Sequence, residues 1–458
     1  MNIFIKIVGK LIIPILAVIS FLYVGLYNED YHYKYLFCMP LFYFFISIFF
    51  LLPQLSLKSS IFYIVLNVIF FFRYVVLPFM TVFSEFYYGR SPVLPQISSF
   101  NLSFFLIVYE LFIAGIVASW CEKKYQKHQS YHQILKMKLG SNKNLIFILF
   151  SIFTILYLLL NRNWLAGVNF FKANRIEAAF DENVMISSYL FLILKQILFV
   201  FFVYSCSVNY KKTNRKIYLL FSIIILFVNM GIFFGTNRSD VLITTIVSAL
   251  LLADLFPLKV IKYSMLFILL SVSVLISQIT DTRQLKSISN NENQLVDGTD
   301  FLQSYLGGPY NVAIAVETKE TFPEVSRPEV LFFDIARPMI GINFLVKNMN
   351  LKYSNVYFNQ RMFMTEQRSQ ILPMIGQGYI FFGEVFAPIF SILVIILAYY
   401  FMGFSRNYSN PLLSYFFLLS IVRMAFFVGQ NTMNIINDIS FNLFLFLIIF
   451  YLNKKFHF

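Results

Sequence analysis

Arginine and lysine are distributed differently along this chain, and the arginines are the first residues whose placement suggests chemistry. Lysine predominates between alternate apolar runs, and arginine predominates in the remaining segments. A planar guanidinium binds phosphate or carboxylate through two parallel hydrogen bonds, which an ammonium group cannot do. The arginine group therefore predicts recognition of an anionic ligand, while each single arginine has the alternative of pairing with an acid of the outer loop. The arginines concerned are Arg90, Arg162, Arg175, Arg238, Arg283, Arg327, Arg337, Arg361 and Arg368.

Charged residues also occur within the apolar runs, where each costs about 3 kcal/mol or more unless it faces a partner or a cavity. Glu110 and Lys195 lie in the middle of runs, Arg73 and Arg423 lie nearer one end, and Glu384 lies in the first turns of a late run. Two interpretations stay open. Either Lys195 and Glu110 form a buried pair that holds two helices together, or these groups line a polar cavity that holds lipid phosphates.

The composition excludes a soluble globular protein. Of the 458 residues, 59% are hydrophobic and 13% are charged, and the mean hydropathy is +0.72. Soluble domains carry roughly 45–50% apolar and 25% charged residues. Runs such as 145–160 and 218–234 are continuously apolar, which favours spanning helices over the short alternating strands of a membrane barrel. The sequence therefore predicts an all-α polytopic integral membrane protein.

Twelve apolar runs approach the roughly 20 residues that a spanning helix needs. If the N-terminus is cytoplasmic, the inner segments collect most of the lysines and a single acid, Glu122. Because basic residues remain on the cytoplasmic side, both termini are expected in the cytoplasm, and the net charge of +14 reflects topology rather than nucleic-acid binding. The predicted spans are 9–27, 35–53, 60–82, 101–120, 144–161, 186–207, 217–235, 240–257, 263–280, 377–403, 412–429 and 437–453.

One outer segment, 281–376, is far longer than the other connections and lies between the ninth and tenth runs. Connections longer than about 15 residues are usually functional or disordered. Disorder is expected for 286–300, whereas 329–349 is apolar enough to pack or to lie on the membrane surface. We expect a single polytopic domain over 1–458, with an extracytoplasmic cap at 281–376 and a smaller outer loop at 162–185.

Three short stretches carry a resemblance to a known family. They are Gly235–Asp240 (GTNRSD), Tyr305–Tyr310 (YLGGPY) and Pro373–Gly383 (PMIGQGYIFFG). Together with about twelve spans, both ends inside and one large outer loop late in the chain, they resemble the Wzy-type polysaccharide repeat-unit polymerases of bacteria.

The resemblance implies a glycosyltransferase that joins undecaprenyl-diphosphate-linked oligosaccharide repeat units into O-antigen, capsule or exopolysaccharide at the outer face of the bacterial cytoplasmic membrane. It implies lipid-linked oligosaccharides, membrane lipid, a chain-length regulator and a flippase as partners. O-antigen ligases resemble the same architecture but rely on a histidine in the great outer loop, and 281–376 contains none. A flippase or other transporter is a further alternative, but such proteins typically have short loops and internal repeats, and no repeat is evident here. A third alternative is a lipid-linked glycosyltransferase with an acidic first outer loop, for which Glu29 and Asp30 are the matching residues.

Such a reaction displaces a diphosphate from a sugar carbon by an acceptor hydroxyl, and it needs fixed cations for the leaving group and a carboxylate base. Two diphosphate sites are expected, one with Arg238 and Arg283 and the other with Arg361 and Arg368. Arg238 has the strongest local argument, because it opens a helix whose free N–H groups also favour phosphate. No metal-ligand spacing occurs in the outer segments, so no metal or cofactor is expected. Further candidates are Arg162 and Arg175 for diphosphate, and Glu366, Glu384 and Asp240 for the base.

Overall fold

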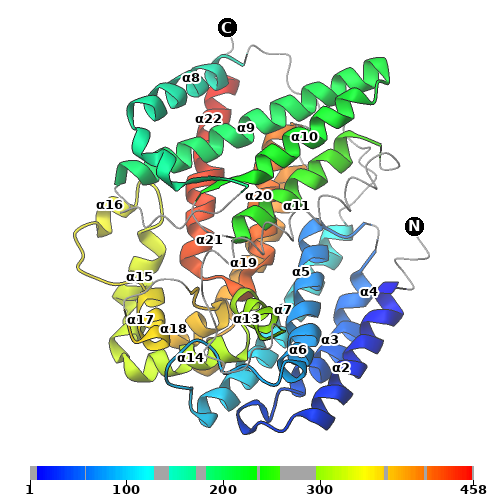
Figure 1. The fold of residues 1–458 in the computed structure, drawn as a ribbon, viewed down its shortest axis with the longest axis vertical. Coiled ribbons are helices and arrows are strands. Elements are labelled where there is room, and N and C mark those ends of the chain that lie inside the picture. The colour runs from blue at the N-terminus through cyan, green and yellow to red at the C-terminus, as the bar shows by residue number, and fades with distance from the viewer. Residues whose placement is uncertain are drawn as a thin grey trace. The chain divides into compact units, whose positions relative to one another are not determined.

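The computed structural model describes residues 8–56, 58–127, 144–171, 182–234, 238–257, 295–365, 370–406 and 410–455. These residues are mostly helical and form two compact units (Figure 1). Unit 1 is the described part of Met1–His132, Lys286–Gly403 and Ile421–Asn437. Unit 2 is the described part of Gln133–Leu285, Phe404–Ser420 and Asp438–Phe458.

The chain is a multi-pass helical membrane protein. Six helices are long and apolar enough to cross a membrane, and a seventh candidate is the pair α18 (Met374–Phe386) and α19 (Ile389–Arg406), bent by 108° at a short break. The expected runs at 144–161, 217–235 and 412–429 fall on shorter apolar helices. The run at 263–280 lies outside the described residues, so twelve spans and the topology remain predictions. The six long candidates are Gly9–Tyr27, Tyr31–Gln54, Ile61–Phe83, Ile97–Lys127, Ile186–Thr213 and Thr432–Lys455.

Prolines explain why the first three spans are not uniform α-helices. Each contains a π-helical turn that ends two residues before a proline, namely Pro14, Pro53 or Pro78. A proline has no N–H to donate, and its ring crowds the carbonyl four residues earlier, so the preceding turn widens. The helix continues after Pro14 and Pro78, whereas after Pro53 it ends at Gln54. The widened turn before Pro78 holds Arg73, the largest fully buried side chain of the structure as described.

Unit 1 combines the first four candidate spans with the described part of the great outer loop. Its connecting segment 84–96 has no regular structure. The elements of unit 1 are η1 (Val8–Ile12), α2 (Ile13–Tyr27), η2 (Tyr31–Tyr33), α3 (Cys38–Ile46), η3 (Ser47–Leu51), α4 (Leu52–Gln54), α5 (Ile61–Phe71), η4 (Phe72–Val76), α6 (Leu77–Phe83), α7 (Ile97–Lys127), α13 (Leu295–Leu306), α14 (Pro309–Thr321), η6 (Pro323–Ser326), α15 (Pro328–Ala336), α16 (Asn343–Val346), α17 (Ser354–Phe363), α18 (Met374–Phe386), η7 (Phe427–Gly429), and the parts of α19 (Ile389–Arg406), α20 (Pro411–Ala425) and α21 (Thr432–Asp438) within its ranges.

The great loop is built into unit 1. Helix α13 runs antiparallel to α6: Thr299 Oγ1 donates to Met80 O at 3.2 Å, and farther along the chain Gly307 O accepts from Arg73 at 2.8 Å. Every residue from Pro309 to Thr318 of α14 is buried, and α14 packs on α7, α17 and α18 (Figure 1). The expected disorder is therefore wrong for 295–300, which is helical; 286–294 lies outside the described residues.

Unit 2 contains a helical hairpin and a small antiparallel sheet. Helices α9 and α10 pack along each other, and the strands pair Val168 with Phe234 and Phe170 with Ile232. The sheet places the start of the 162–185 loop beside the chain that leads to Arg238. The elements of unit 2 are α8 (Leu145–Leu160), η5 (Arg162–Gly167), β1 (Val168–Phe170), α9 (Glu182–Thr213), α10 (Ile217–Gly231), β2 (Ile232–Phe234), α11 (Arg238–Leu255), η8 (Ile439–Phe444), α22 (Leu445–Lys455) and the remaining parts of α19, α20 and α21.

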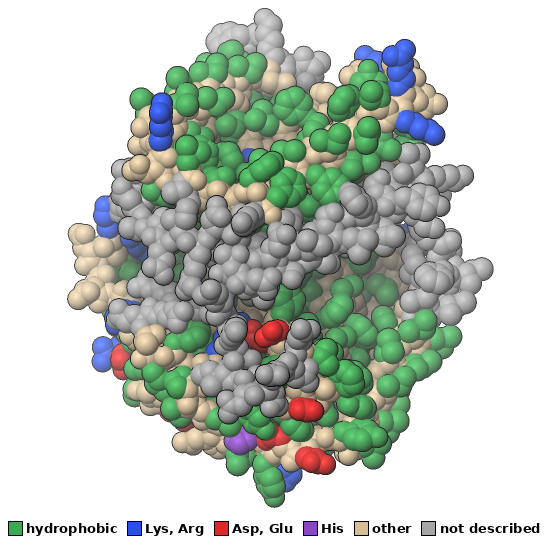
Figure 2. Space-filling view, in the orientation of Figure 1, with side chains coloured by type: hydrophobic (Ala, Val, Ile, Leu, Met, Phe, Trp, Pro, Cys, Tyr) green, Lys and Arg blue, Asp and Glu red, His purple; other side chains and the backbone are tan. Residues whose placement is uncertain are grey.

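The surface of unit 2 has the character that a lipid environment requires. Figure 2 shows hydrophobic side chains gathered over the region of α8, α9 and α10. Along α8, Ile148, Phe153 and Leu159 are more than half exposed. Such a continuous apolar surface is rare on soluble monomers and is normal where acyl chains cover it.

Candidate functional site

The predicted site residues that the structure describes are divided between the two units. Arg162 begins η5 in unit 2, where its Nε donates to Leu159 O at 3.3 Å. Asp240 is half-buried in the first turn of α11, the helix that Arg238 begins. In unit 1, Arg361 is buried in α17 and Glu384 is exposed near the end of α18. The Arg238 side chain and the residues Arg175, Arg283, Glu366 and Arg368 lie outside what the structure describes.

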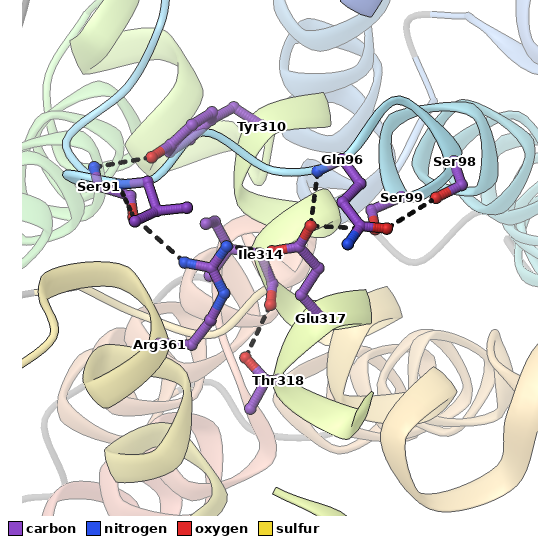
Figure 3. Close-up of polar contacts among 10 residues, drawn as sticks. Ser91, Gln96, Ser98, Ser99, Tyr310, Ile314, Glu317, Thr318 and Arg361 are labelled. Atoms are coloured by element: carbon purple, nitrogen blue, oxygen red, sulfur yellow. Dashed lines mark hydrogen bonds and ion pairs between the residues drawn. The ribbon is translucent and has the colours of Figure 1, made fainter. Parts of the chain in front are cut away.

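Arg361 is paired with a carboxylate of its own loop (Figure 3). One terminal nitrogen contacts Glu317 on α14, and the other donates to Ser91 Oγ at 3.3 Å. The Glu317 carboxylate also accepts from the Gln96 N–H at 2.6 Å and from the Ser99 hydroxyl at 3.2 Å. The pair thus ties α17 and α14 to the segment that leads into α7.

A second pair joins the great loop to the segment 84–96. Arg90 donates from Nε to Asp300 Oδ1 at 2.9 Å, and a terminal nitrogen contacts Oδ2. The Tyr87 hydroxyl donates to the same carboxylate. Burial, together with the Asp300 carboxylate, raises the pKa of Tyr87 well above its ordinary value, which keeps this phenol a neutral donor. Arg90 and Arg361 therefore both pair with acids of the outer loop, which is the alternative that the sequence left open.

The third pair lies between candidate spans. Arg73 and Glu110 are completely buried and 2.6 Å apart, from Nη1 to Oε2. The second terminal nitrogen of Arg73 donates to Gly307 O at 2.8 Å, and the second oxygen of Glu110 accepts from Ser391 Oγ at 2.6 Å. These bonds join α7 and the first turn of α19 to the turn between α13 and α14. A buried charge pair needs such additional hydrogen bonds to offset its desolvation.

The first of the two interpretations, a pair between Lys195 and Glu110, is wrong. Lys195, in α9 of unit 2, donates from Nζ to Asn229 O at 3.0 Å and to Ile232 O at 2.8 Å. These carbonyls lie where α10 ends, and helix ends leave carbonyls without an intrahelical partner. The Asp240 carboxylate is near enough to interact with this ammonium group electrostatically. Lys195 therefore closes the end of α10 beside the start of α11.

Asp334 is a buried carboxylate that sequence reasoning did not single out. It accepts from the Ser354 N–H at 3.0 Å, from the Ser354 hydroxyl and from Gln377 Nε2 at 2.9 Å. Gln377 in turn binds Thr432 through its amide nitrogen and oxygen, both at 2.9 Å. Burial raises the pKa of Asp334 to about 6. A carboxylate with a perturbed pKa is typical of functional sites, and the available signal was an acid inside the apolar stretch 330–336.

The second and third stretches of the family resemblance pack against each other in unit 1. A Cβ added to Gly307 would lie 3.0 Å from Pro373 Cβ. Gly376, in the third stretch, packs instead on α14, because a Cβ added there would lie 2.6 Å from Ala315 Cβ. Gly307 has a φ of +57°, a conformation that favours glycine. The turn Tyr305–Tyr310 and the start of α18 are therefore in direct contact, beside the Arg73–Glu110 pair.

No family model, curated protein or solved structure matches the chain. The interpretation therefore rests on the residues and their geometry. Among the described residues, no group of three or more His, Cys, Asp or Glu side chains is arranged to hold a metal ion. Unit 1 contains a set of buried carboxylates and guanidinium groups between the great loop and the candidate spans. Hydrogen bonds to charged groups are strong in such a buried environment.

The raised pKa of Asp334 predicts a pH-dependent stability. Below about pH 4 the carboxyl is protonated in both the folded and the unfolded protein, and above about pH 6 it is ionised in both. Between these values only the unfolded chain releases the proton, so the contribution of Asp334 to the free energy of unfolding falls by about 3 kcal/mol as the pH rises. We expect Asp334→Asn to abolish this part of the pH dependence in thermal unfolding of the detergent-solubilised protein.

The control for this prediction is Asp297→Asn, at an exposed position of α13. It should keep the wild-type slope between pH 4 and 6. An Asp334→Asn variant with the same slope as the wild type would contradict the role assigned to Asp334.

Proposed function

We propose that the chain is a membrane-embedded polysaccharide repeat-unit polymerase. It is a glycosyltransferase that joins undecaprenyl-diphosphate-linked oligosaccharides at the outer face of the cytoplasmic membrane. The observation that carries the proposal is the contact between the turn Tyr305–Tyr310 and the start of α18. Two of the three stretches that resemble the Wzy-type family, 63 residues apart in sequence at their nearest ends, meet in one place. A loop that served only as a connection would not need to be built in this way into the spans.

The chemistry follows from the substrates of such an enzyme. The bond between the donor sugar and its diphosphate breaks, a bond to the acceptor hydroxyl oxygen forms, and the hydroxyl proton passes to a base. Arg361 and Arg368 are proposed to bind one diphosphate, and Arg238 and Arg283 the other. Arg361 would then share its guanidinium between Glu317 and phosphate oxygens. A carboxylate partner of this kind holds the guanidinium in one orientation before the ligand arrives.

We propose that the catalytic base is one of three carboxylates, Glu384, Asp240 or Glu366. Glu384 is exposed near the break between α18 and α19, and Asp240 lies at the start of α11; Glu366 follows α17. Asp334 has no exposed surface, so we assign it a positioning role, in which it holds α15 and α17 against Gln377 of α18.

The first test is deletion of the gene in the bacterium that carries it, followed by gel analysis of the surface polysaccharide and analysis of the carrier lipid. A polymerase deletion removes long chains and leaves single repeat units on outward-facing lipid. A transporter is the second candidate, because the 108° bend between α18 and α19 resembles the broken helices that line transport sites. Single units trapped on the cytoplasmic face would establish the transporter and overturn the polymerase.

Complementation of the deletion with Arg361→Lys tests the site. Lysine keeps a positive charge for Glu317 but cannot make two parallel bonds to phosphate. We expect long-chain polysaccharide to fall by about tenfold to a hundredfold, which corresponds to loss of one hydrogen bond between charged groups. The matched control is Arg327→Lys, exposed in the same loop, which should complement fully. Full activity of a stably expressed Arg361→Lys protein would show that Arg361 is only a structural partner of Glu317.

A further inference from the structure

Residues 337–352, which connect α15 to α17, present apolar side chains outward although they lie outside every candidate span. The buried side chain of Val346 packs with Phe333 and Ala336, so the segment is held on α15 by a small core of its own. A soluble connection usually turns such side chains inward. The exposed ones, with their exposed fractions, are Phe344 (67%), Leu345 (59%), Met349 (41%) and Ile342 (39%).

The charges of this segment are all of one sign. It contains Arg337, Lys347 and Lys352 and no acid. The preceding part of the same loop is different, since Asp297, Glu320 and Glu329 are exposed there. An apolar tip flanked by basic residues is the pattern of segments that lie in the interface of a membrane containing anionic lipid.

We propose that residues 337–352 are seated in the phospholipid leaflet next to the great loop, with Phe344 and Leu345 at the boundary between headgroups and acyl chains and the basic residues at the phosphates of anionic phospholipid. Phospholipid is the expected partner of this segment, because unit 1 carries the candidate spans that cross the bilayer. Three residues before the segment, Asp334 is bound to Gln377 in α18, the first half of the bent apolar pair. The segment therefore begins beside a helix that belongs to the membrane.

This contact is independent of the proposed polymerase activity and is tested without it. The chain has two tryptophans, Trp120 and Trp164, which are first replaced by phenylalanine. Phe344→Trp is then introduced, and the protein is reconstituted into phosphatidylcholine vesicles with and without phosphatidylglycerol. Lipids brominated at the shallow end of the acyl chain quench a tryptophan in the interface, whereas iodide quenches one in water. The matched control is Thr321→Trp, exposed at the end of α14 beyond the Glu317 contact with Gln96.

Shallow brominated lipid is expected to lower the Phe344→Trp emission about twofold or more, as for a side chain at the headgroup–acyl boundary, and to leave Thr321→Trp unchanged. Adding Lys347→Gln and Lys352→Gln should reduce the quenching in vesicles that contain phosphatidylglycerol. Quenching of Phe344→Trp by iodide and not by lipid would overturn the proposal. So would protection from both quenchers, because the segment would then be covered by protein. Leu345→Trp provides a second exposed reporter.

Discussion

Replacing Arg73 with methionine is expected to destabilise the protein by about 3–5 kcal/mol, because it leaves Glu110 buried without its cation. Glu110→Gln should cost a similar amount, since the guanidinium then keeps only neutral partners. Both changes also loosen the turn between α13 and α14, whose Gly307 carbonyl accepts from Arg73. The measurement is thermal unfolding of the purified protein in detergent.

The double variant Arg73→Met with Glu110→Gln shows whether Arg73 and Glu110 act as a charge pair or make two independent contacts. If the two groups chiefly neutralise each other, the double variant should be at least as stable as either single one, so the coupling energy should be about 3 kcal/mol or more. Additive losses would contradict the pairing and would favour two separate roles inside a polar cavity. The matched control is Asn67→Leu, a buried polar residue of the same span whose amide bonds within its own helix.

Gly429→Ala is expected to cost about 3 kcal/mol or more and to abolish the proposed activity, because there is no room for a side chain at this position. A Cβ there would lie 1.9 Å from Tyr305 O and 2.5 Å from Tyr305 C. These are backbone atoms, so the contact cannot be relieved by rotation of a side chain. The substitution must separate η7 from the turn Tyr305–Tyr310, and with it the packing of that turn against Pro373.

The control is Gly403→Ala, in α19, where an added Cβ has no neighbour within 4 Å. Alanine is the better helix former, so this variant should be as stable as the wild type or slightly more stable. Melting temperatures and complementation of the gene deletion are compared for the two variants. Equal behaviour of Gly429→Ala and Gly403→Ala would show that the turn does not depend on the close approach of η7.

The partners of the outer arginines can be inferred from the sequence only as a chemical class. The sequence predicts an anionic partner for the outer arginines but does not decide between a ligand and a carboxylate of the chain. Arg90 contacts Asp300, which lies 210 residues later in the chain. Arg361 contacts Glu317, which lies 44 residues earlier. Such pairings depend on which helices become neighbours, and no local pattern reports this. The role of Arg361 in diphosphate binding therefore remains a prediction.

The sequence by itself determined that the protein is helical and crosses a membrane several times. This information is local: a run of about 20 apolar residues must satisfy its backbone within one helix wherever it lies in the bilayer. The cost of a charge in a span was also evident, and it correctly marked Glu110 as a residue that requires a partner.

Only the tertiary structure decided what those partners are. It pairs Glu110 with Arg73 rather than with Lys195, buries α14 within unit 1, and buries Asp334 against Ser354 and Gln377. The physical reason is that buried charges and close-packed glycines gain or lose free energy through neighbours distant in sequence. Hydropathy reports how each segment meets lipid, whereas the site depends on how segments meet one another.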